Sequence, residues 1–295
     1  MEKQNLQFSH KEKSMSKPIF LCAISNVSSG SCSENCKFCT QSAHYNTDIE
    51  NYKFKPVKKI LLEAKKAEDN GVLGFCLVTA GKGLNTKTLE YICSTAKRIK
   101  NSHPNLNLIA CNGTASISQL KQLKNAGIDS YNHNLESAAS YYPDICTTHS
   151  WNERYETCEN VKEVGLNLCT GGIFGMGESA KQRLELIEQI LSLKPESVPI
   201  NFFHPNPALP LTKNNIEVKE GLDLISMLRE KSSKMRIMVA GGRETFFKIE
   251  QEKIFSAGAN AIVLGDYLTT SGNRPSTDLE MLKNLNLSIA TSCHD

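Results

Sequence analysis

The stretch Ala126-Gly127-Ile128-Asp129-Ser130-Tyr131-Asn132-His133-Asn134 contains the two features on which the fold prediction depends. A glycine ends a segment with helical periodicity, and a short run of strand-forming residues follows it directly. Glycine is favoured at such a junction because it readily adopts the left-handed backbone conformation that ends many helices. The stretch therefore predicts a helix that passes through a tight joint into a strand.

The same kind of joint recurs along the chain, at Asn70-Gly71, Val164-Gly165-Leu166-Asn167 and Ala257-Gly258-Ala259-Asn260. Short apolar runs alternate with segments of 3.6-residue periodicity such as residues 57–68, where Ile60 and Ala64 share a face. The expected strands are residues 19–24, 75–79, 106–111, 130–134, 167–170, 198–203, 236–240 and 261–264. Eight strands alternating with helices over roughly 250 residues favour an α/β fold of the (β/α)8 TIM-barrel type, with a doubly wound sheet as the alternative.

Composition excludes several classes of protein. Of the 295 residues, 40% are hydrophobic and 22% are charged, and the mean hydropathy of −0.33 is typical of a globular chain rather than a disordered or fibrous one. The net charge of +3 is too small to indicate a nucleic-acid partner or an anionic membrane. No apolar run is long enough to span a membrane, and residues 1–17 do not have the pattern of a signal peptide. We therefore expect a cytoplasmic protein with a loose N-terminal extension, residues 1–17, before a single barrel domain, residues 18–295.

Three of the eleven cysteines lie together directly after the first expected strand, in Ser31-Cys32-Ser33-Glu34-Asn35-Cys36-Lys37-Phe38-Cys39. An odd number of cysteines in a chain without an export signal argues against a disulfide framework. In a barrel this loop lies on the side where active sites are found. Three thiolates on one loop can hold three irons of a cubane cluster and leave the fourth iron open to another ligand. A zinc site that borrows a ligand such as His44 is the alternative, although such sites usually contain a second CxxC pair.

Three further cysteines, Cys76, Cys111 and Cys169, fall on the second, third and fifth expected strands, and Arg243 follows the seventh. Parallel barrel strands all end at one mouth, so residues distant in sequence can meet there. The alternative for each cysteine is a small buried hydrophobic side chain. For Arg243 the alternative is a clamp for an anion or a carboxylate. The cysteines without a motif are Cys22, which we expect in the core, Cys93, Cys146, Cys158 and Cys293.

Asn132, Asn134 and Glu136 are spaced by two, so on one strand they would share a face. Three polar side chains that face a barrel interior are costly to bury unless they bind something; a solvated loop is the alternative. The glycine run at residues 171–177 lacks the Lys-Ser/Thr ending of a phosphate-binding P-loop. We therefore expect a loop there, either flexible or held close to a ligand.

Together these motifs resemble the biotin synthases, a family of radical S-adenosylmethionine enzymes. The resemblance extends from about residue 20 to residue 287, and it depends on the CxxxCxxC motif together with residues 131–136, 169–178, 198–201 and 240–244. It implies the radical S-adenosylmethionine barrel fold and an enzyme that inserts sulfur into dethiobiotin to form biotin, the last step of biotin biosynthesis. The cofactors that it implies are a 4Fe–4S cluster, a 2Fe–2S cluster and S-adenosyl-L-methionine. Another radical enzyme on the same barrel and a non-enzymatic zinc-binding scaffold are the two rival functions.

The resemblance also implies roles for individual residues. The 4Fe–4S ligands are Cys32, Cys36 and Cys39, and the 2Fe–2S ligands are Cys76, Cys111, Cys169 and Arg243. The contacts to S-adenosylmethionine are Phe38, Asn134, Glu136 and Arg154, and those to the substrate are Asn132 and Asn201. For Arg154 the alternative is an ordinary exposed helix arginine.

The resemblance is incomplete at three positions. Family members commonly have aspartate in place of Glu136 and often tyrosine in place of Phe38, and many have arginine where this chain has Gly74. The family further implies a homodimer and a reduced electron donor of the flavodoxin or ferredoxin type. It implies neither a nucleic-acid nor a membrane partner.

Overall fold

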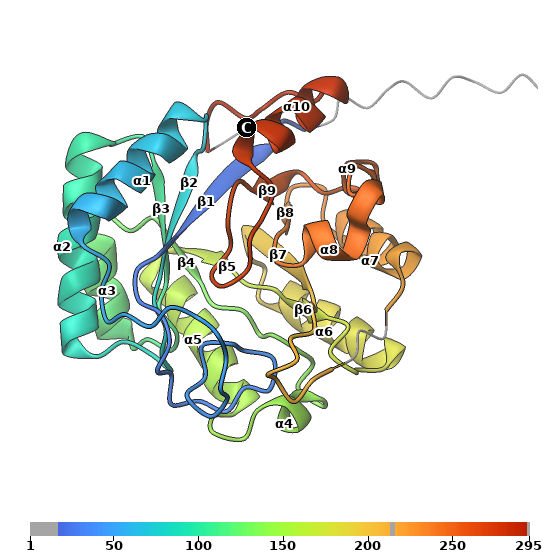
Figure 1. The fold of residues 1–295 in the computed structure, drawn as a ribbon, viewed down its shortest axis with the longest axis horizontal. Coiled ribbons are helices and arrows are strands. Elements are labelled where there is room, and N and C mark those ends of the chain that lie inside the picture. The colour runs from blue at the N-terminus through green and yellow to red at the C-terminus, as the bar shows by residue number, and fades with distance from the viewer. Residues whose placement is uncertain (1–16, 213–215, 294–295) are drawn as a thin grey trace, which may run out of the picture.

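The computed structural model describes residues 17–212 and 216–293. It contains one closed barrel of parallel strands with helices on its outer side (Figure 1). The strands are β1 (Phe20–Asn26), β2 (Gly74–Val78), β3 (Asn107–Cys111), β4 (Ser130–Asn132), β5 (Asn167–Cys169), β6 (Gly172–Phe174), β7 (Ser197–Phe202), β8 (Arg236–Val239) and β9 (Ala261–Val263). Their order in the sheet is β5-β4-β3-β2-β1-β9-β8-β7-β6, and a further pairing of β5 with β7 closes the ring. The predicted barrel is confirmed, whereas the expected N-terminal extension lies outside the described residues apart from Lys17.

The helices cover the outside of this barrel, and local sequence explains where several of them begin and end. They are α1 (Val57–Asp69), α2 (Thr86–Ser102), α3 (Ile117–Asn125), α4 (Tyr142–Ile145), α5 (Trp151–Val164), α6 (Ala180–Ser192), α7 (Val218–Lys231), α8 (Arg243–Phe247), the short 3₁₀ helix η1 (Lys248–Glu250), α9 (Lys253–Ala257) and α10 (Pro275–Asn284). Capping boxes at Ser116, Ser150 and Ser179 begin α3, α5 and α6. Gly165, with φ 71°, ends α5 in the left-handed conformation that the joints predict.

The glycine run after β5 is partly a strand, so the prediction of a loop over residues 171–177 is wrong in part. Gly172–Phe174 forms β6, and Gly172 pairs with Ile200 of β7. Glycine is required here because the backbones approach closely: a Cβ atom on Gly171 would collide with the carbonyl oxygen of Pro199. Together β5 and β6 occupy the fifth strand position of the barrel.

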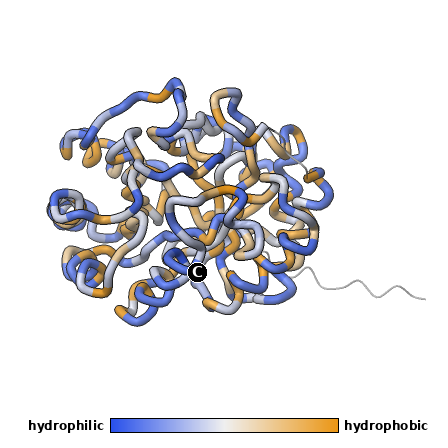
Figure 2. The backbone as a smooth tube through the Cα atoms, turned by 90° about the horizontal axis from the view of Figure 1, so that it is seen from below, coloured by the Kyte–Doolittle hydropathy of each residue, from blue (hydrophilic) through white to orange (hydrophobic). Residues whose placement is uncertain are grey.

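Apolar side chains form one layer between the barrel and the helices and a second layer inside the barrel. The outer layer includes Leu21 and Leu77 of the strands with Ile60 of α1. The inner layer includes Cys22 and Cys76, because neighbouring residues on a strand point to opposite faces. Hydrophobic segments accordingly concentrate in the interior of the molecule (Figure 2). Within the described ranges, the structure contains no helix with the length and apolar character that crossing a membrane requires.

Candidate active site

A cavity of about 770 Å³ lies inside the barrel, a volume typical of small-molecule sites. It brings together most of the residues that the sequence singles out. Those that line it are Phe38, Cys39, Cys76, Cys111, Asn132, Asn134, Glu136, Cys169 and Asn201. The barrel therefore collects candidate cluster ligands and candidate substrate contacts around one space.

The loop that carries Cys32, Cys36 and Cys39 is closed by its own backbone. The amide of Cys32 donates to the carbonyl oxygen of Gln41 at 3.0 Å, and the amide of Cys39 donates to that of Cys36 at 3.0 Å. A further bond of 2.9 Å, from the amide of Lys37 to the carbonyl oxygen of Ile145, joins the loop to α4, and the two segments lie side by side in Figure 1. All three cysteines are partly buried residues. Cys39 lines the cavity, whereas Cys32 and Cys36 are not part of its lining and the thiol of Cys36 contacts Cys146.

Burial raises the pKa of Cys39 to about 11 and also raises that of Cys32. Both groups are therefore neutral thiols near pH 7, and a metal ion that binds them must displace their protons. His44, the alternative zinc ligand, instead contacts the carbonyl oxygen of Ser33 through Nε2 at 2.9 Å. Its ring is thereby engaged with the backbone of the same loop.

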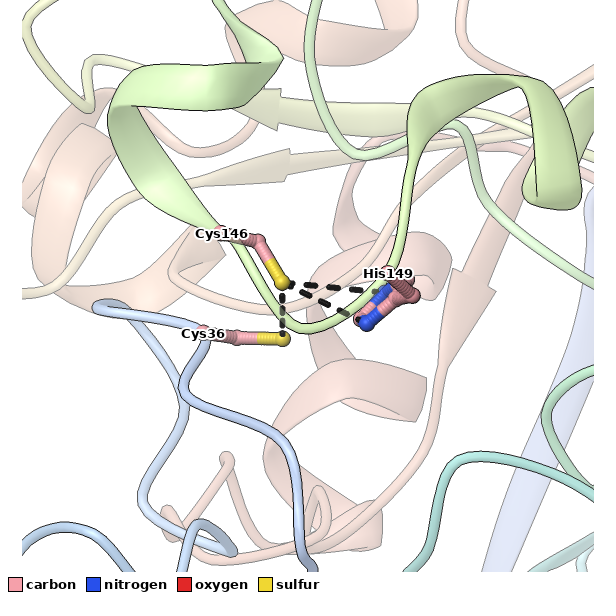
Figure 3. Close-up of side chains that lie close together, drawn as sticks. All are labelled: Cys36, Cys146 and His149. Carbon is pink, nitrogen blue, oxygen red and sulfur yellow. Dashed lines mark hydrogen bonds between the residues drawn. The ribbon is translucent and has the colours of Figure 1, made fainter.

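Cys36 lies beside two residues that the sequence reasoning missed as site residues, Cys146 and His149 (Figure 3). Its Sγ atom is 3.6 Å from Sγ of Cys146, which is 3.3 Å from Nδ1 of His149. The hydrogen bond from Cys36 lowers the pKa of Cys146, and the hydrogen bond to His149 acts in the same direction. His149 also contacts Glu34 through Nδ1 at 2.7 Å. In the sequence, the feature that could have indicated these two residues as site residues is their spacing of three positions, just after the short helix α4.

Asn132, Asn134 and Glu136 face the cavity although β4 ends at Asn132, two residues before the end of the predicted strand. The chain continues alongside β5: the amide of His133 donates to the carbonyl oxygen of Cys169 at 2.9 Å, and Glu136 forms a bridge with Gly172. The alternation of side chains therefore persists beyond the strand. This excludes the solvated loop for these three residues.

Three buried acceptor atoms on these side chains lack a hydrogen-bond partner among the described residues. They are Oδ1 of Asn132, Oδ1 of Asn134 and Oε2 of Glu136. An acceptor that is buried without a partner costs free energy, so native structures supply a partner in nearly every case. The site therefore fits a ligand that carries several hydrogen-bond donors.

Arg154 of α5 forms a buried ion pair with Glu136 at this position. Its Nη2 donates to Oε1 of Glu136 at 2.8 Å, and its Nε donates to the carbonyl oxygen of Asn134 at 2.7 Å. Burial raises the pKa of Glu136, whereas the positive charge of Arg154 acts in the opposite direction. Arg154 is thus not an ordinary exposed helix arginine. It holds one carboxylate oxygen and leaves the other without a protein partner.

The cysteines of the barrel strands line the cavity from neighbouring positions. Burial raises the pKa of Cys111 and of Cys169 to about 12, and it raises that of Cys76 well above its ordinary value. Cys22, expected in the core, is buried and lines the same cavity. Thiols of this kind are neutral until a metal displaces their protons.

Arg243 is not brought to these cysteines. It is fully buried outside the cavity lining, where its guanidinium donates to both carboxylate oxygens of Asp278 in α10, at 3.0 and 2.6 Å. Burial opposes its charge, but the hydrogen bonds with Asp278 and the negative charges around it raise its pKa above the ordinary value. A protonated guanidinium is only a donor and has no lone pair for iron. The alternative prediction for Arg243, a clamp for a carboxylate, therefore agrees with its contact to Asp278.

The space beside Gly74, where many relatives have arginine, is filled by Phe20. A Cβ atom on Gly74 would lie 2.8 Å from Cε1 of Phe20. The guanidinium of Arg236 lies over the ring of Phe20, 3.8 Å from the ring centroid, and Arg236 lines the cavity. A guanidinium therefore reaches this part of the cavity from β8 instead of β2.

Asn201 and Phe38 have structural contacts of their own. Nδ2 of Asn201 donates to the carbonyl oxygen of Gly172 at 3.1 Å, and its Oδ1 accepts from the amide of Gly241 at 2.9 Å. This side chain joins β6 to the segment after β8.

Phe38 packs against the apolar cluster that includes Tyr142 and Met176.

Two family models match the chain. Residues 26–190 match the radical SAM superfamily, and residues 199–288 match the biotin and thiamin synthesis associated domain. Biotin synthase from a Nitratiruptor species is 57% identical over 277 residues, which cover 94% of this chain and 99% of that protein. Biotin synthase from Aliarcobacter butzleri is 54% identical over 276 residues, covering 94% and 98%.

Solved structures support the same fold at low sequence identity. Methylornithine synthase superposes with a TM-score of 0.79 at 17% identity, covering 92% of this chain and 84% of that one. An FeFe-hydrogenase maturase from Carboxydothermus hydrogenoformans superposes with a TM-score of 0.78 at 17% identity, covering 92% and 67%. These two similarities concern the fold, whereas the sequence matches extend over nearly the whole chain. The chain belongs to the biotin synthase family of radical S-adenosylmethionine enzymes.

Proposed function

We propose that the residues around the barrel cavity carry out the reaction of this family, the radical S-adenosylmethionine-dependent insertion of sulfur into dethiobiotin to form biotin. One observation carries the proposal: a single cavity is lined by a cysteine of the three-cysteine loop, by three acceptors without partners and by thiols from several strands. Such a cavity can bring two clusters and two small molecules within reach of one another. Holding reactants in register is the main contribution that a protein makes to cofactor chemistry.

The family implies a 4Fe–4S cluster and S-adenosylmethionine. We assign the cluster to Cys32, Cys36 and Cys39, since three thiols on one closed loop fit three irons and leave the fourth open. When bound, this cluster supplies the electron that cleaves S-adenosylmethionine. The protons of the three thiols leave the site as iron binds.

The acceptors without partners suit the donors of S-adenosylmethionine. We assign its ribose hydroxyls to Oδ1 of Asn134 and Oε2 of Glu136, both of which lack a partner in the described structure. Arg154 supports this contact because it holds the other carboxylate oxygen of Glu136 at 2.8 Å. Its charge also suits the methionine carboxylate. Phe38 lies at the cavity wall, where an aromatic ring can cover the adenine.

The substrate contacts are assigned to Asn132 and Asn201. Oδ1 of Asn132 lacks a partner in the described part of the chain and can accept an N–H of the ureido ring of dethiobiotin. Asn201 lines the same cavity, and each of its amide atoms retains capacity for a second hydrogen bond beyond those to Gly172 and Gly241. Apolar cavity residues such as Ile24 and Val78 exclude water from the reacting carbons.

We assign the sulfur-donating 2Fe–2S cluster to Cys76, Cys111 and Cys169, whose thiols line the cavity. Arg243 does not fit this cluster, because it is paired with Asp278 outside the cavity lining. We further propose that residues 18–295 act as one domain, in a cytoplasmic homodimer that receives electrons from a reduced flavodoxin- or ferredoxin-type protein. The homodimer and the electron donor rest on the family resemblance, whereas the single domain rests on the one closed barrel and the cytoplasmic location on the composition of the chain.

Anaerobic iron and sulfide analysis of the purified and reconstituted protein, followed by a dethiobiotin assay, tests the proposal. We expect about six irons per chain, as one 4Fe–4S and one 2Fe–2S cluster require, together with biotin formation. About four irons and cleavage of S-adenosylmethionine without biotin would favour another radical enzyme on this barrel. Zinc without iron would overturn the assignment of an enzyme.

A further inference from the structure

The cluster assigned to the barrel strands lacks one protein ligand. A 2Fe–2S cluster held by thiolates uses four of them, and Cys76, Cys111 and Cys169 supply three. Arg243 cannot complete the set from its position, since its guanidinium is fully buried against Asp278 and does not line the cavity. A fourth ligand must therefore come from another residue of the cavity wall.

Cys22 of β1 lies at the required position on the barrel. In the register of β1 with β2, Cys22 is opposite Gly74 and Ile24 is opposite Cys76. Cys22 and Ile24 point to the same face of β1, so the thiols of Cys22 and Cys76 lie on one face, one strand and two residues apart. Both residues are buried and line the cavity.

Cys76 and Cys111 have the same relation, one strand and two residues apart. In the register of β2 with β3, Cys76 is opposite Ile109 and Val78 is opposite Cys111. Cys22, Cys76 and Cys111 thus form a diagonal row across three adjacent strands, and Cys169 faces them from β5. The offset between neighbouring thiols is two residues in both steps, from Cys22 to Cys76 and from Cys76 to Cys111. Cys22 therefore extends the row of Cys76 and Cys111 by one strand.

Arg236 of β8 lines the same cavity as the four thiols, and its guanidinium lies over the ring of Phe20, 3.8 Å from the ring centroid. A cation at this position offsets part of the negative charge that four thiolates bring to a metal. Cys22 is a free thiol whose hydrogen bond to the carbonyl oxygen of Ala23 is long, at 3.8 Å.

We propose that Cys22 is the fourth protein ligand of the auxiliary cluster, which is then held by Cys22, Cys76, Cys111 and Cys169 without an arginine. This inference rests on the proposed function, because it specifies the ligands of a cluster that the family reaction requires. Each of the four thiols loses one proton as it binds iron, and no oxidant is needed for that exchange. Two rival ligands also line the cavity, Arg236 and Cys293.

The test compares single variants of the full chain after anaerobic reconstitution. Iron and sulfide content, the Mössbauer spectrum and cleavage of S-adenosylmethionine are measured for Cys22→Ala, Cys22→Ser, Cys111→Ala and the matched control Cys293→Ala. We expect Cys22→Ala to fall from about six to about four irons, as Cys111→Ala does, and to retain cleavage. We expect Cys293→Ala to keep about six irons.

The serine variant gives a readout that a merely structural role would not change. A serine oxygen in place of one sulfur shifts the absorption bands of the cluster to shorter wavelength and changes the Mössbauer parameters of one iron. A spectrum shifted in this way supports the proposal. Loss of about two irons with the 4Fe–4S cluster intact supports it as well. An unshifted spectrum at full iron content overturns it. This variant decides the question if Cys22→Ala does not fold, as judged by circular dichroism and retention of the 4Fe–4S cluster.

Three outcomes separate the inference from the function on which it rests. Cys22→Ala with full iron content and the wild-type spectrum overturns Cys22 as a ligand, and loss of the auxiliary cluster in Arg236→Lys or Cys293→Ala but not in Cys22→Ala assigns the fourth position to that residue. About four irons in the unaltered protein instead contradict the proposed function itself.

Discussion

Nη2 of Arg154 donates to Oε1 of Glu136 at 2.8 Å, and both side chains are mostly buried. Glu136 also has a positive φ of 67°, which is uncommon for a residue with a side chain. The ion pair and the backbone conformation together fix the carboxylate at the cavity wall. Arg154 is therefore a positioning residue for Glu136 as well as a source of positive charge.

Replacing Glu136 by Gln is expected to weaken binding of S-adenosylmethionine about 10- to 100-fold. A hydrogen bond to a charged group contributes roughly 1.5–3 kcal/mol, and the substitution leaves the charge of Arg154 without its partner. Equilibrium dialysis with labelled S-adenosylmethionine measures the effect. The matched variant Glu136→Asp keeps the charge and should lose less. Wild-type affinity in Glu136→Gln would remove this residue from the site.

Substitution of one cysteine from each set separates the two proposed clusters. Cys32→Ala is expected to abolish cleavage of S-adenosylmethionine, because the loop then has too few thiols for three irons. Cys111→Ala is expected to retain cleavage and to lose biotin formation. Chromatography of the cleavage products and of biotin measures both activities. Equal loss of the two activities in Cys111→Ala would contradict this division of labour.

The carboxylate of Asp278 is expected to stabilise the fold and not to ligate a cluster. Asp278→Asn removes the fully buried partner of Arg243 and leaves its ion pair with Glu244 at 2.9 Å, so we expect a cost below the roughly 3–5 kcal/mol that is typical of a buried charge left without any partner. We expect a melting temperature lower by several degrees with an unchanged iron content, measured by calorimetry and iron analysis. The control is Glu250→Gln, which breaks the exposed pair with Lys253 and should cost less than about 1 kcal/mol. A selective loss of about two irons in Asp278→Asn would connect Arg243 to the auxiliary cluster after all.

His133 is expected to make the fold less stable in mild acid. It is buried, its Nε2 has no partner in the described structure, and burial followed by the charges of Arg154 and His149 lowers its pKa well below the ordinary value of 6.5. The unfolded chain takes up a proton below pH 6.5, whereas the folded chain does not. The contribution of His133 to the free energy of unfolding is thus fully present above pH 6.5. Below that pH it decreases, by at most about 1.4 kcal/mol per pH unit.

Urea denaturation at several pH values measures this effect as the difference between the unaltered protein and His133→Asn. The difference cancels the contributions of other titrating groups. We expect the unaltered protein to lose more stability than the variant between about pH 6.5 and about pH 5. Parallel curves would show that folding does not lower the pKa of His133.

Sequence patterns were sufficient for the barrel because its signals are local. Each glycine joint and each apolar run of a strand is encoded within about ten residues, and the right-handed alternation of strands and helices leaves few ways to close the sheet. The strip Asn132, Asn134 and Glu136 could be predicted to share a surface for the same reason. Its exact continuation beyond β4 could not, because it depends on hydrogen bonds to residues 169–172.

The other differences arise from tertiary contacts. His149 reaches Glu34 across 115 positions of the sequence, and no local pattern encodes that approach. Gly242, with φ 81°, begins α8 and turns the chain so that Arg243 points toward α10 and not into the barrel. A residue just after a strand can face either side, so sequence position alone could not decide the direction of Arg243.

The closure of the barrel has a mechanical consequence. In the described part of the chain β5 meets β7 at one register pair, Cys169 with Ser197, supported by the amide of Thr170 donating to the carbonyl oxygen of Ser197 at 3.1 Å. β6 continues the contact with β7 at three further register pairs, so the proposed iron ligand Cys169 lies at the start of this junction of the ring. In the proposed assignment, iron would link Cys169 to thiols on β2 and β3 and so cross-link β5 to those strands. We then expect the protein without that iron to exchange its β5 amide hydrogens faster than the loaded protein, because this cross-link is absent.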